Sequence, residues 1–405
     1  MTEHRRVTVE LLPYAKTRQQ MEVATLYDSG ASLSEIAKQQ GRNLQNVGRD
    51  IKTMVERAAK KGDSPEYDLK HPAAPGFATK RVSTLYNASG EVSAQWHIQE
   101  PEKQEIDKIL QEFVAAYTDE MRGQHKPTKP PKNTDSDYAS CYLIGDHHLG
   151  MYAWSEETGG DDYDTDIAEQ ILADAVDRLV NSQSIKSEHG WLISLGDFMH
   201  ANDTTSMTPA SKHLLDTDGR FGRVIRVAAR LYKRMVKTML ERHKHVTIFN
   251  VRGNHDPDAS LMINALLQGY YENDPRVTVV DNYSKFLWKK WGQCLVTMHH
   301  GDRVQPQRLY EAITANLSKE WGETSYRVCW TGHLHSKLAV DLGGMNFERW
   351  NVLPPNDAWA AGAAFTQTEQ MRSMTCVVLH KEFGEELRYK VGIRRLRDRK
   401  IATRN

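Results

Sequence analysis

The sequence predicts an α/β protein preceded by a small helical domain, and two observations carry that prediction. Short apolar runs typical of strands recur along residues 138–405, where they alternate with segments of helical spacing. Residues 1–62 carry helical patterns only, interrupted by turn glycines. At 405 residues the chain is long enough for two or three domains, each with its own core.

Five short polar motifs follow strand-like runs directly. They read GDHHLG, GDF, GNHD, HHGD and GHLH, and they begin at Gly145, Gly196, Gly253, His299 and Gly332. The runs before them are Cys141–Ile144, Trp191–Leu195, Val246–Val251, Cys294–Met298 and Arg327–Trp330. In open α/β sheets, sites form beyond the carboxyl ends of the strands. The motifs therefore predict one shared polar site.

The side chains in these motifs suit a pair of divalent cations. Carboxylates, amide oxygens and imidazoles are ligands of such ions. The candidate ligands are Asp146, His148, Asp197, Asn254, His300, His333 and His335. Residues two apart on an extended segment face the same side, which predicts that Asp146 and His148 converge, as do His333 and His335. Unrelated loop polar groups and core histidines are the alternative, but they do not explain five motifs in order.

The motif set resembles the calcineurin-like metallophosphoesterase superfamily over about residues 138–364. The resemblance implies a four-layer α/β/β/α sandwich that hydrolyses phosphoesters with two metal ions. It implies that Asp197 bridges the two ions. The other ligands divide between the first and the second ion as Asp146, His148 and His335, and as Asn254, His300 and His333. We expect Mn²⁺, and the ligand types also suit Fe, Zn or Mg.

The same resemblance gives roles to neighbours of the ligands. His255 protonates the leaving oxygen or stabilises the transition state, and Asp256 orients His255 and raises its basicity. Arg252 matches a phosphate-binding arginine of some branches, with an ordinary surface charge as the alternative. His200 lies in GDFMHAND, where many superfamily nucleases carry GDLFD. It is a candidate for contact with the substrate or with the ligands.

The N-terminal 62 residues predict three helices, with a turn glycine between the second and the third. Helical spacing covers Arg18–Tyr27 and Leu44–Lys60, Ser32 or Ser34 can cap a short helix between them, and Gly41 supplies the turn. This stretch resembles a helix-turn-helix DNA-binding module. It has 11 Lys and Arg against 7 Asp and Glu. The residues predicted to contact DNA are Arg42, Asn43, Gln45, Asn46, Arg49 and Lys52.

Three residues depart from the helix-turn-helix pattern. Gln40 and Arg42 stand where such modules usually have apolar side chains, and Gly48 weakens the last helix. The alternative is a small packing or protein-binding module.

Residues 63–122 connect the two predicted domains. Two alternating runs flank residues 87–90 and predict a hairpin. Glu102–Arg122 has one apolar stripe, which predicts an amphipathic helix that packs within the chain or pairs with a second copy in a homodimer. A Pro- and Lys-rich linker at Gly123–Asp137 precedes the domain that begins at residue 138.

Two further segments bear on the α/β domain. Arg223–Arg242 has helical spacing and a basic face, which either follows a nucleic-acid backbone or is an ordinary solvated surface. Met374–His380 and Leu387–Ile393 have strand patterns and are predicted to close the second sheet of the sandwich.

Composition limits the compartment and the partners. Formal net charge is zero, so charge alone indicates neither nucleic acid nor a membrane. The four cysteines have no CxxC spacing and fit reduced core residues of a cytosolic protein. The N-terminus lacks the apolar segment of a signal peptide, and no apolar run has the length of a membrane span. We expect a cytoplasmic protein that does not associate with membranes.

The leading hypothesis is a metal-dependent DNA nuclease. GDHHLG, GNHD and GHLH resemble the motifs of SbcD-type repair nucleases, and the arrangement of module, hairpin and phosphoesterase resembles bacteriophage and prophage proteins. These resemblances imply a role in phage or bacterial DNA metabolism, inside a bacterial host cell if the chain is phage-encoded. One alternative is a phosphomonoesterase or small-nucleotide phosphodiesterase whose N-terminal module serves assembly. The other is a DNA-binding regulator with a vestigial site, against which the complete ligand set argues.

Overall fold

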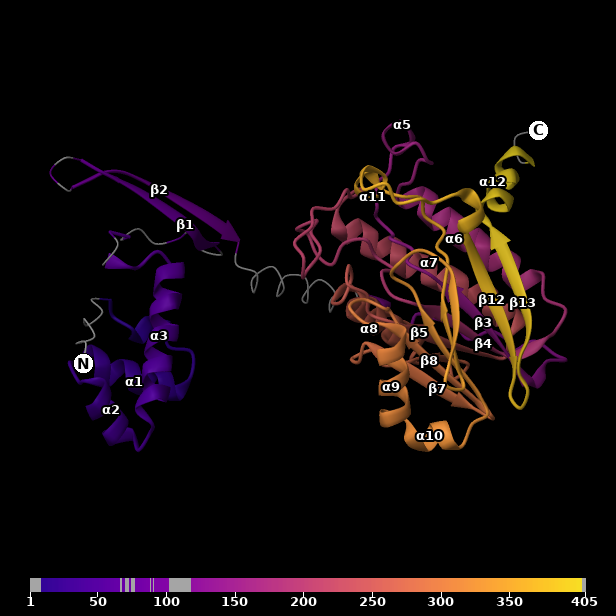
Figure 1. The fold of residues 1–405 in the computed structure, drawn as a ribbon, viewed down its shortest axis with the longest axis horizontal. Coiled ribbons are helices and arrows are strands. Elements are labelled where there is room, and N and C mark those ends of the chain that lie inside the picture. The colour runs from indigo at the N-terminus through magenta and orange to yellow at the C-terminus, as the bar shows by residue number, and fades with distance from the viewer. Residues whose placement is uncertain are drawn as a thin grey trace. The chain divides into compact units, whose positions relative to one another are not determined.

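The computed structural model divides the chain into two compact units, Met1–Phe113 and Val114–Asn405 (Figure 1). It describes residues 9–402 except 66–67, 70–72, 74–76, 88, 90 and 102–117. The helix predicted for Glu102–Arg122 therefore lies mostly outside the described residues. The predicted domain boundaries at residues 62, 122 and 137 stay predictions.

Unit 1 combines a small group of helices with a hairpin. Its described helical elements are η1 (Leu12–Tyr14), α1 (Arg18–Asp28), α2 (Leu33–Gln40) and α3 (Leu44–Lys60). Strands β1 (Phe77–Tyr86) and β2 (Val92–Pro101) pair antiparallel, which confirms the predicted hairpin.

An apolar stripe on α3 organises the helices of unit 1. Val47, Ile51, Met54 and Ala58 repeat every three or four residues, and each is at most 7% exposed. They share one core cluster with side chains of α1 and α2. Burying an aliphatic side chain contributes about 1.5–3 kcal/mol, so this stripe outweighs the weak helix propensity of Gly48.

The turn between α2 and α3 forms as the sequence predicts. Ser32 caps α2 in a capping box with Glu35, and Gly41 ends the helix in the left-handed region at φ 60°. Asn43 caps α3 by accepting a hydrogen bond from the backbone of Gln45. Arg42 tolerates its usually apolar position because its guanidinium lies 2.7 Å from the Asp50 carboxylate.

Unit 2 contains two mixed sheets. The six-stranded sheet has the order β13-β12-β3-β4-β5-β6, and β3 to β6 are parallel. Its strands are β3 (Asp135–Ile144), β4 (Ser187–Ser194), β5 (His245–Asn250), β6 (Val277–Val279), β12 (Ser373–His380) and β13 (Gly384–Gly392). The five-stranded sheet has the order β10-β11-β9-β8-β7. Its strands are β7 (Phe286–Trp291), β8 (Cys294–His299), β9 (Tyr326–Thr331), β10 (Leu338–Leu342) and β11 (Met345–Arg349).

Helices cover the outer faces of both sheets. The helical elements of unit 2 are α5 (Ser155–Thr158), α6 (Thr165–Asn181), α7 (Phe221–Arg242), α8 (Ala259–Tyr271), α9 (Pro306–Asn316), α10 (Ser318–Gly322), α11 (Ala358–Gly362), η3 (Glu369–Met371) and α12 (Ile393–Ala402). Helices α6 and α7 lie side by side across the six-stranded sheet (Figure 1). Leu309 and Ile313 of α9 pack on the outer face of the other sheet.

The main core of unit 2 lies between the two sheets. Trp191 and Phe249 of the six-stranded sheet share one buried cluster with Val296 and Trp330 of the five-stranded sheet. The layers therefore run helix, sheet, sheet, helix, which confirms the predicted four-layer α/β/β/α sandwich.

One part of the strand prediction is wrong. β12 and β13 exist, but they extend the six-stranded sheet and do not close the second one. β12 pairs antiparallel with β3, with Thr375 opposite Leu143. This pairing joins residues more than two hundred positions apart, and the local sequence carries no signal for it.

Three arginines of the basic face predicted on α7 form ion pairs with acids of α6. Arg223 pairs with Asp166, Arg230 with Glu169, and Arg234 with Asp177. These arginines join two helices, so the solvated-surface alternative describes α7 better than a nucleic-acid track.

Within the described residues, no helix combines the length and the apolar character needed to cross a membrane.

Candidate metal centre

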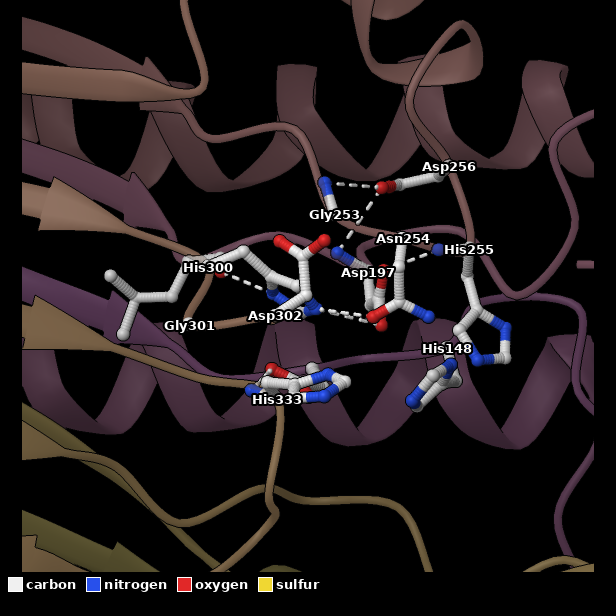
Figure 2. Close-up of polar contacts among 12 residues, drawn as sticks. His148, Asp197, Gly253, Asn254, His255, Asp256, His300, Gly301, Asp302 and His333 are labelled. Carbon is white, nitrogen blue, oxygen red and sulfur yellow. Dashed lines mark hydrogen bonds and ion pairs between the residues drawn. The ribbon is translucent and has the colours of Figure 1, made fainter. Parts of the chain in front are cut away.

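The seven predicted ligands lie together at one edge of the sandwich. Asp146, Asp197 and Asn254 follow β3, β4 and β5, while His300 follows β8 and His333 and His335 follow β9. The parallel strands of each sheet end at the same edge, so these loops meet there. Figure 2 shows His148, Asp197, Asn254, His300 and His333 pointing toward one another.

The first group of ligands is Asp146, His148 and His335, whose ligand atoms all lie within 4.8 Å of one another. His335 Nε2 lies 3.2 Å from His148 Nε2 and 3.0 Å from Asp146 Oδ2. Asp146 and His148 are buried. This is the set that the resemblance assigns to the first ion.

The second group contains Asp197, His300 and His333, again with ligand atoms within 4.8 Å of one another. His300 Nε2 lies 3.0 Å from both Asp197 Oδ2 and Asn254 Oδ1. His300 Nδ1 lies 2.9 Å from the carbonyl oxygen of Leu195. A carbonyl only accepts, so Nδ1 carries a proton and Nε2 is the atom available to a metal ion.

Both groups fit divalent cations by their charge and their donor types. Burial alone would raise the pKa of the Asp197 carboxyl, but His300, His255 and His148 lower it well below its usual range. Burial likewise lowers the pKa of His300, and the Asp197 carboxylate outweighs it and raises that pKa to about 10. Buried carboxylates require a counter-charge, and a divalent ion can replace the proton of His300 in that role.

The ligand loops hold an uncommon backbone conformation. His148, Asp197, His333 and His335 lie in the left-handed region, with φ of 47°, 50°, 72° and 50°. Non-glycine residues rarely occupy this region, and such strain gathers at functional sites. Asp146 and His148 converge on one ligand group, as the sequence predicts, whereas His333 and His335 belong to different groups. The predicted reason is wrong, because turns and not extended segments aim these rings.

His255 lies beside both groups of ligands. Its backbone amide donates a hydrogen bond to Asp197 Oδ1 at 2.8 Å, and its Nδ1 donates to the carbonyl oxygen of His200 at 2.9 Å. The ring centroid lies 4.8 Å from that of His148. With Nδ1 committed to a carbonyl, Nε2 is the atom left to exchange a proton with a substrate.

Asp256 does not orient the His255 ring, which corrects the prediction. Its Oδ1 accepts from the backbone amides of Asp197 and Gly253, and its Oδ2 accepts from the amide of Met199. Figure 2 shows this carboxylate directed at Gly253 and Asp197, away from the imidazole. Burial, followed by the nearby Asp197 charge, raises the pKa of Asp256 to about 6. Asp256 thus fixes the loops that carry Asp197 and Asn254.

The His200 ring is buried and stacks on the ring of His255. It is 1% exposed, its ring stacks on His255 at 5.3 Å, and its Nδ1 lies 3.2 Å from His148 Nδ1. This burial leaves His200 almost no surface that a substrate could contact. Of the two predicted roles, contact with the ligands is the one it fulfils.

Arg252 has protein partners. Its Nε donates to the carbonyl oxygen of Pro257 at 2.8 Å, and its Nη1 donates to that of Tyr283 at 3.0 Å. These bonds join two loops beside the centre, and phosphate binding by Arg252 stays a prediction.

The glycines of the motifs are the functional residues that the sequence analysis missed. A Cβ on Gly332 would lie 2.2 Å from Asp146 Oδ1, and a Cβ on Gly253 would lie 1.9 Å from Asp197 Oδ1. Such contacts are impossible without movement of the ligand carboxylate. The signal was present, since four of the five motifs begin with glycine.

Of the residues predicted to contact DNA, four are exposed on α3, and two lie just before it and make contacts within unit 1. Gln45, Asn46, Arg49 and Lys52 are exposed, and Asn43 and Arg42 serve the cap and the Asp50 ion pair described above. The exposed four share the helix face opposite the apolar stripe.

Comparison with known proteins gives a limited result. No family model matches the chain, and no curated protein matches it. Among solved structures it is similar to a predicted phosphoesterase from Streptococcus pneumoniae, with 13% identity over 64% of this chain and 99% of that chain and a TM-score of 0.27. An archaeal phosphodiesterase shares 11% identity over 62% and 99%, with a TM-score of 0.30. A 5′-nucleotidase precursor from Thermus thermophilus shares 10% over 65% and 58%, with a TM-score of 0.31.

Identities and TM-scores this low carry no argument about activity. The class of protein rests instead on the four-layer fold and on the two ligand groups at its strand ends. The four-layer fold is the one that the resemblance to calcineurin-like metallophosphoesterases implied, and the metal-binding roles of the two groups stay predictions.

Proposed function

We propose that the chain is a two-metal phosphodiesterase that cleaves DNA. The observation that carries the hydrolase part is the pair of ligand groups around Asp197, with His255 directly beside them. Two divalent ions in these groups, when bound, neutralise the phosphoryl oxygens and supply an activated water. We propose Mn²⁺ as the ion, and the oxygen and imidazole ligands of both groups also suit Fe, Zn or Mg.

The chain's own residues have separate tasks in this proposal. The ligand side chains hold the ions, and their left-handed backbone keeps the imidazoles aimed inward. His255 holds a proton at Nε2 and delivers it to the leaving oxygen, because its Nδ1 is fixed on the His200 carbonyl. Asp256 holds the Asp197 loop, and the His200 ring stacks on His255 and positions it.

The DNA part of the proposal is supported by unit 1. A capped short helix, a left-handed glycine turn and a longer helix follow one another, as in helix-turn-helix modules. The exposed face of the longer helix offers Arg49 and Lys52 to phosphates and Gln45 and Asn46 to base edges.

The test compares His255→Ala with wild type on labelled single- and double-stranded DNA and on a bis-aryl phosphodiester, with Mn²⁺. We expect DNA cleavage to fall by a factor of about 10² or more, since general-acid groups contribute about 10²–10⁴. Bound metal, measured by elemental analysis, should stay at the wild-type level. His189→Ala is the matched control, because His189 begins β4 at the opposite end from the centre.

Retained DNA cleavage in His255→Ala would contradict the role given to His255. Hydrolysis of the bis-aryl diester by wild type without any cleavage of DNA would favour the small-nucleotide alternative, with the N-terminal module used for assembly. Metal-loaded wild type that is inactive on every substrate but binds DNA would favour the regulator.

A further inference from the structure

An exposed cluster of rings lies outside the metal centre. We name His213, Trp359 and Phe365 the aromatic platform. The Trp359 ring centroid lies 4.8 Å from that of His213 and 5.6 Å from that of Phe365. Trp359 is 54% exposed and Phe365 is 57% exposed. Large rings that contact each other but stay open to solvent add little to the core and mark a binding surface.

The loop that carries His213 begins and ends at the metal centre. Its first residue, His200, stacks on His255, and the amide of His200 donates to the carbonyl of Leu149. At its other end, the amide of Asp218 donates to the carbonyl of Gly150. Leu149 and Gly150 directly follow the ligand His148, so both ends of this loop are fixed to the first motif.

The loop that carries Trp359 and Phe365 reaches the same edge of the sandwich. It runs from β11 to β12, and β12 begins beside the end of β3, where Asp146 follows. A Cβ on Gly145 would lie 2.5 Å from the carbonyl oxygen of Asn351, so this loop touches the first motif. Helix α11, which carries Trp359, also contacts α5 of the loop after that motif (Figure 1).

The aromatic platform is suited to bind a nucleobase, just as the metal centre is suited to bind a phosphate. Aromatic rings bind bases by stacking, at about 1–3 kcal/mol per base and with little sequence preference. Exposed Lys212 precedes His213 and gives the same loop a cation for the sugar-phosphate backbone. A base inside a duplex has no free face, so such a surface selects unpaired nucleotides.

We propose that the aromatic platform stacks an unpaired base of the substrate strand and thereby gives the centre a preference for single-stranded or frayed DNA. This inference rests on the proposed function and specifies its substrate. The surface takes a base rather than an apolar peptide because both of its loops are anchored at the first motif of the proposed phosphodiester site and one of them carries Lys212.

The first experiment measures binding in EDTA, so that cleavage does not interfere. Fluorescence anisotropy gives the Kd of a labelled ten-thymidine strand for wild type, Trp359→Ala and Trp359→Phe. We expect Trp359→Ala to raise the Kd about 5- to 150-fold, which corresponds to the loss of stacking on one base. Trp359→Phe keeps a ring and should recover most of the affinity. Trp288→Ala is the matched control, since Trp288 is an exposed tryptophan on β7 of the other sheet.

A second substrate separates stacking from general damage. The same strand with stable abasic sugars offers phosphates without bases, so its Kd should be similar for wild type and Trp359→Ala. Phe365→Ala, with Phe383→Ala as its control at the far end of β12, tests the platform without changing a tryptophan. Both platform variants should also lower kcat/KM for cleavage of the ten-thymidine strand in Mn²⁺.

The outcomes separate this inference from the proposed function. Equal Kd values for wild type, Trp359→Ala and Phe365→Ala on the thymidine strand would overturn the platform, as would an equal loss on the abasic strand. Loss of a concentration-dependent dimer in Trp359→Ala, without any change in Kd, would overturn it in favour of a second copy as the occupant. Tight, Trp359-dependent binding without cleavage by wild type would support the platform and contradict the nuclease.

Discussion

Single glycines set the spacing between the ligand loops of the metal centre. Gly196 would bring a Cβ to 2.4 Å from His300 Nδ1, and Gly332 would bring one to 2.2 Å from Asp146 Oδ1. In both places one motif's glycine touches the ligand of another motif. The site therefore requires glycine at these positions, because only a residue without a Cβ lets the two loops approach this closely.

Gly332→Ala is expected to lower metal affinity without unfolding the sandwich. The added methyl displaces the Asp146 carboxylate, which accepts a hydrogen bond from the backbone of His333 at 3.0 Å. We expect bound Mn²⁺, measured by titration calorimetry, to weaken at least about tenfold, as happens when groups supporting a ligand are disturbed. Gly322→Ala is the control, because nothing lies within 4 Å of its Cβ position. If Gly332→Ala bound metal with wild-type affinity, the loop that carries Gly332 would have moved to accept the methyl group, and the required close approach would be contradicted.

Asp256 shows where reasoning from sequence neighbours fails. Adjacent to His255 in GNHD, it was expected to act on that ring, yet its carboxylate binds three backbone amides. Neighbouring side chains on a turn point in different directions, and two of the three amides bound by Asp256, those of Asp197 and Met199, come from the distant β4 loop. The sequence predicted which residues gather at this site. It did not predict where each side chain points, because that depends on the geometry of the turns.

At the scale of elements, the sequence predicted those whose signals are local. Helices α1, α3 and α7 follow their apolar spacing, and every motif follows the strand expected before it. The placement of β12 and β13 failed because a strand pattern specifies a strand and not its partner. The ion pairs of α7 were likewise not predictable from its own sequence, since the acids that pair with its arginines lie on α6.

Helix α3 carries the prediction for DNA binding. Arg49→Ala together with Lys52→Ala removes two exposed cations opposite the buried stripe, so it should weaken DNA binding about tenfold or more without changing the fold of unit 1. The slope of log Kd against log salt should fall by about one for each phosphate that the protein no longer binds. Arg18→Ala is the charge control, because Arg18 begins α1 and its side chain is 93% exposed. Unchanged affinity and slope in the double variant would favour the protein-binding alternative for unit 1.

At the scale of the whole molecule, each unit has its own core, and the chemistry is divided between them. All seven ligands and the aromatic platform belong to unit 2, while the candidate DNA-reading helix belongs to unit 1. Among the described residues, the buried histidines also lie in unit 2. The two units should therefore differ in their response to acid.

His243 makes that difference measurable. His243 is the C-cap of α7 and is buried. Its Nδ1 donates to the Ser187 carbonyl of β4 at 2.8 Å, and its Nε2 accepts from the Tyr142 hydroxyl of β3 at 2.7 Å. Burial lowers the pKa of His243 to about 4, against 6.5 for the free side chain. Between these values the unfolded chain binds a proton that the folded chain does not, so stability is complete above pH 6.5 and is lost as pH falls toward 4.

The size of this effect follows from the difference in pKa. At about 1.4 kcal/mol for each unit, the loss approaches about 3 kcal/mol at the acid end of the window. His243→Gln cannot titrate there, so its deficit in the free energy of unfolding relative to wild type should be largest at pH 8 and should shrink by that amount toward pH 4. Urea unfolding of the intact chain measures this difference in the free energy of unfolding. Tryptophan fluorescence reports mainly on unit 2, because Trp96 is the one tryptophan of the sequence outside that unit. A deficit that stays constant between pH 8 and pH 4 would show that His243 has the same pKa in the folded and unfolded chains, which contradicts the effect of burial.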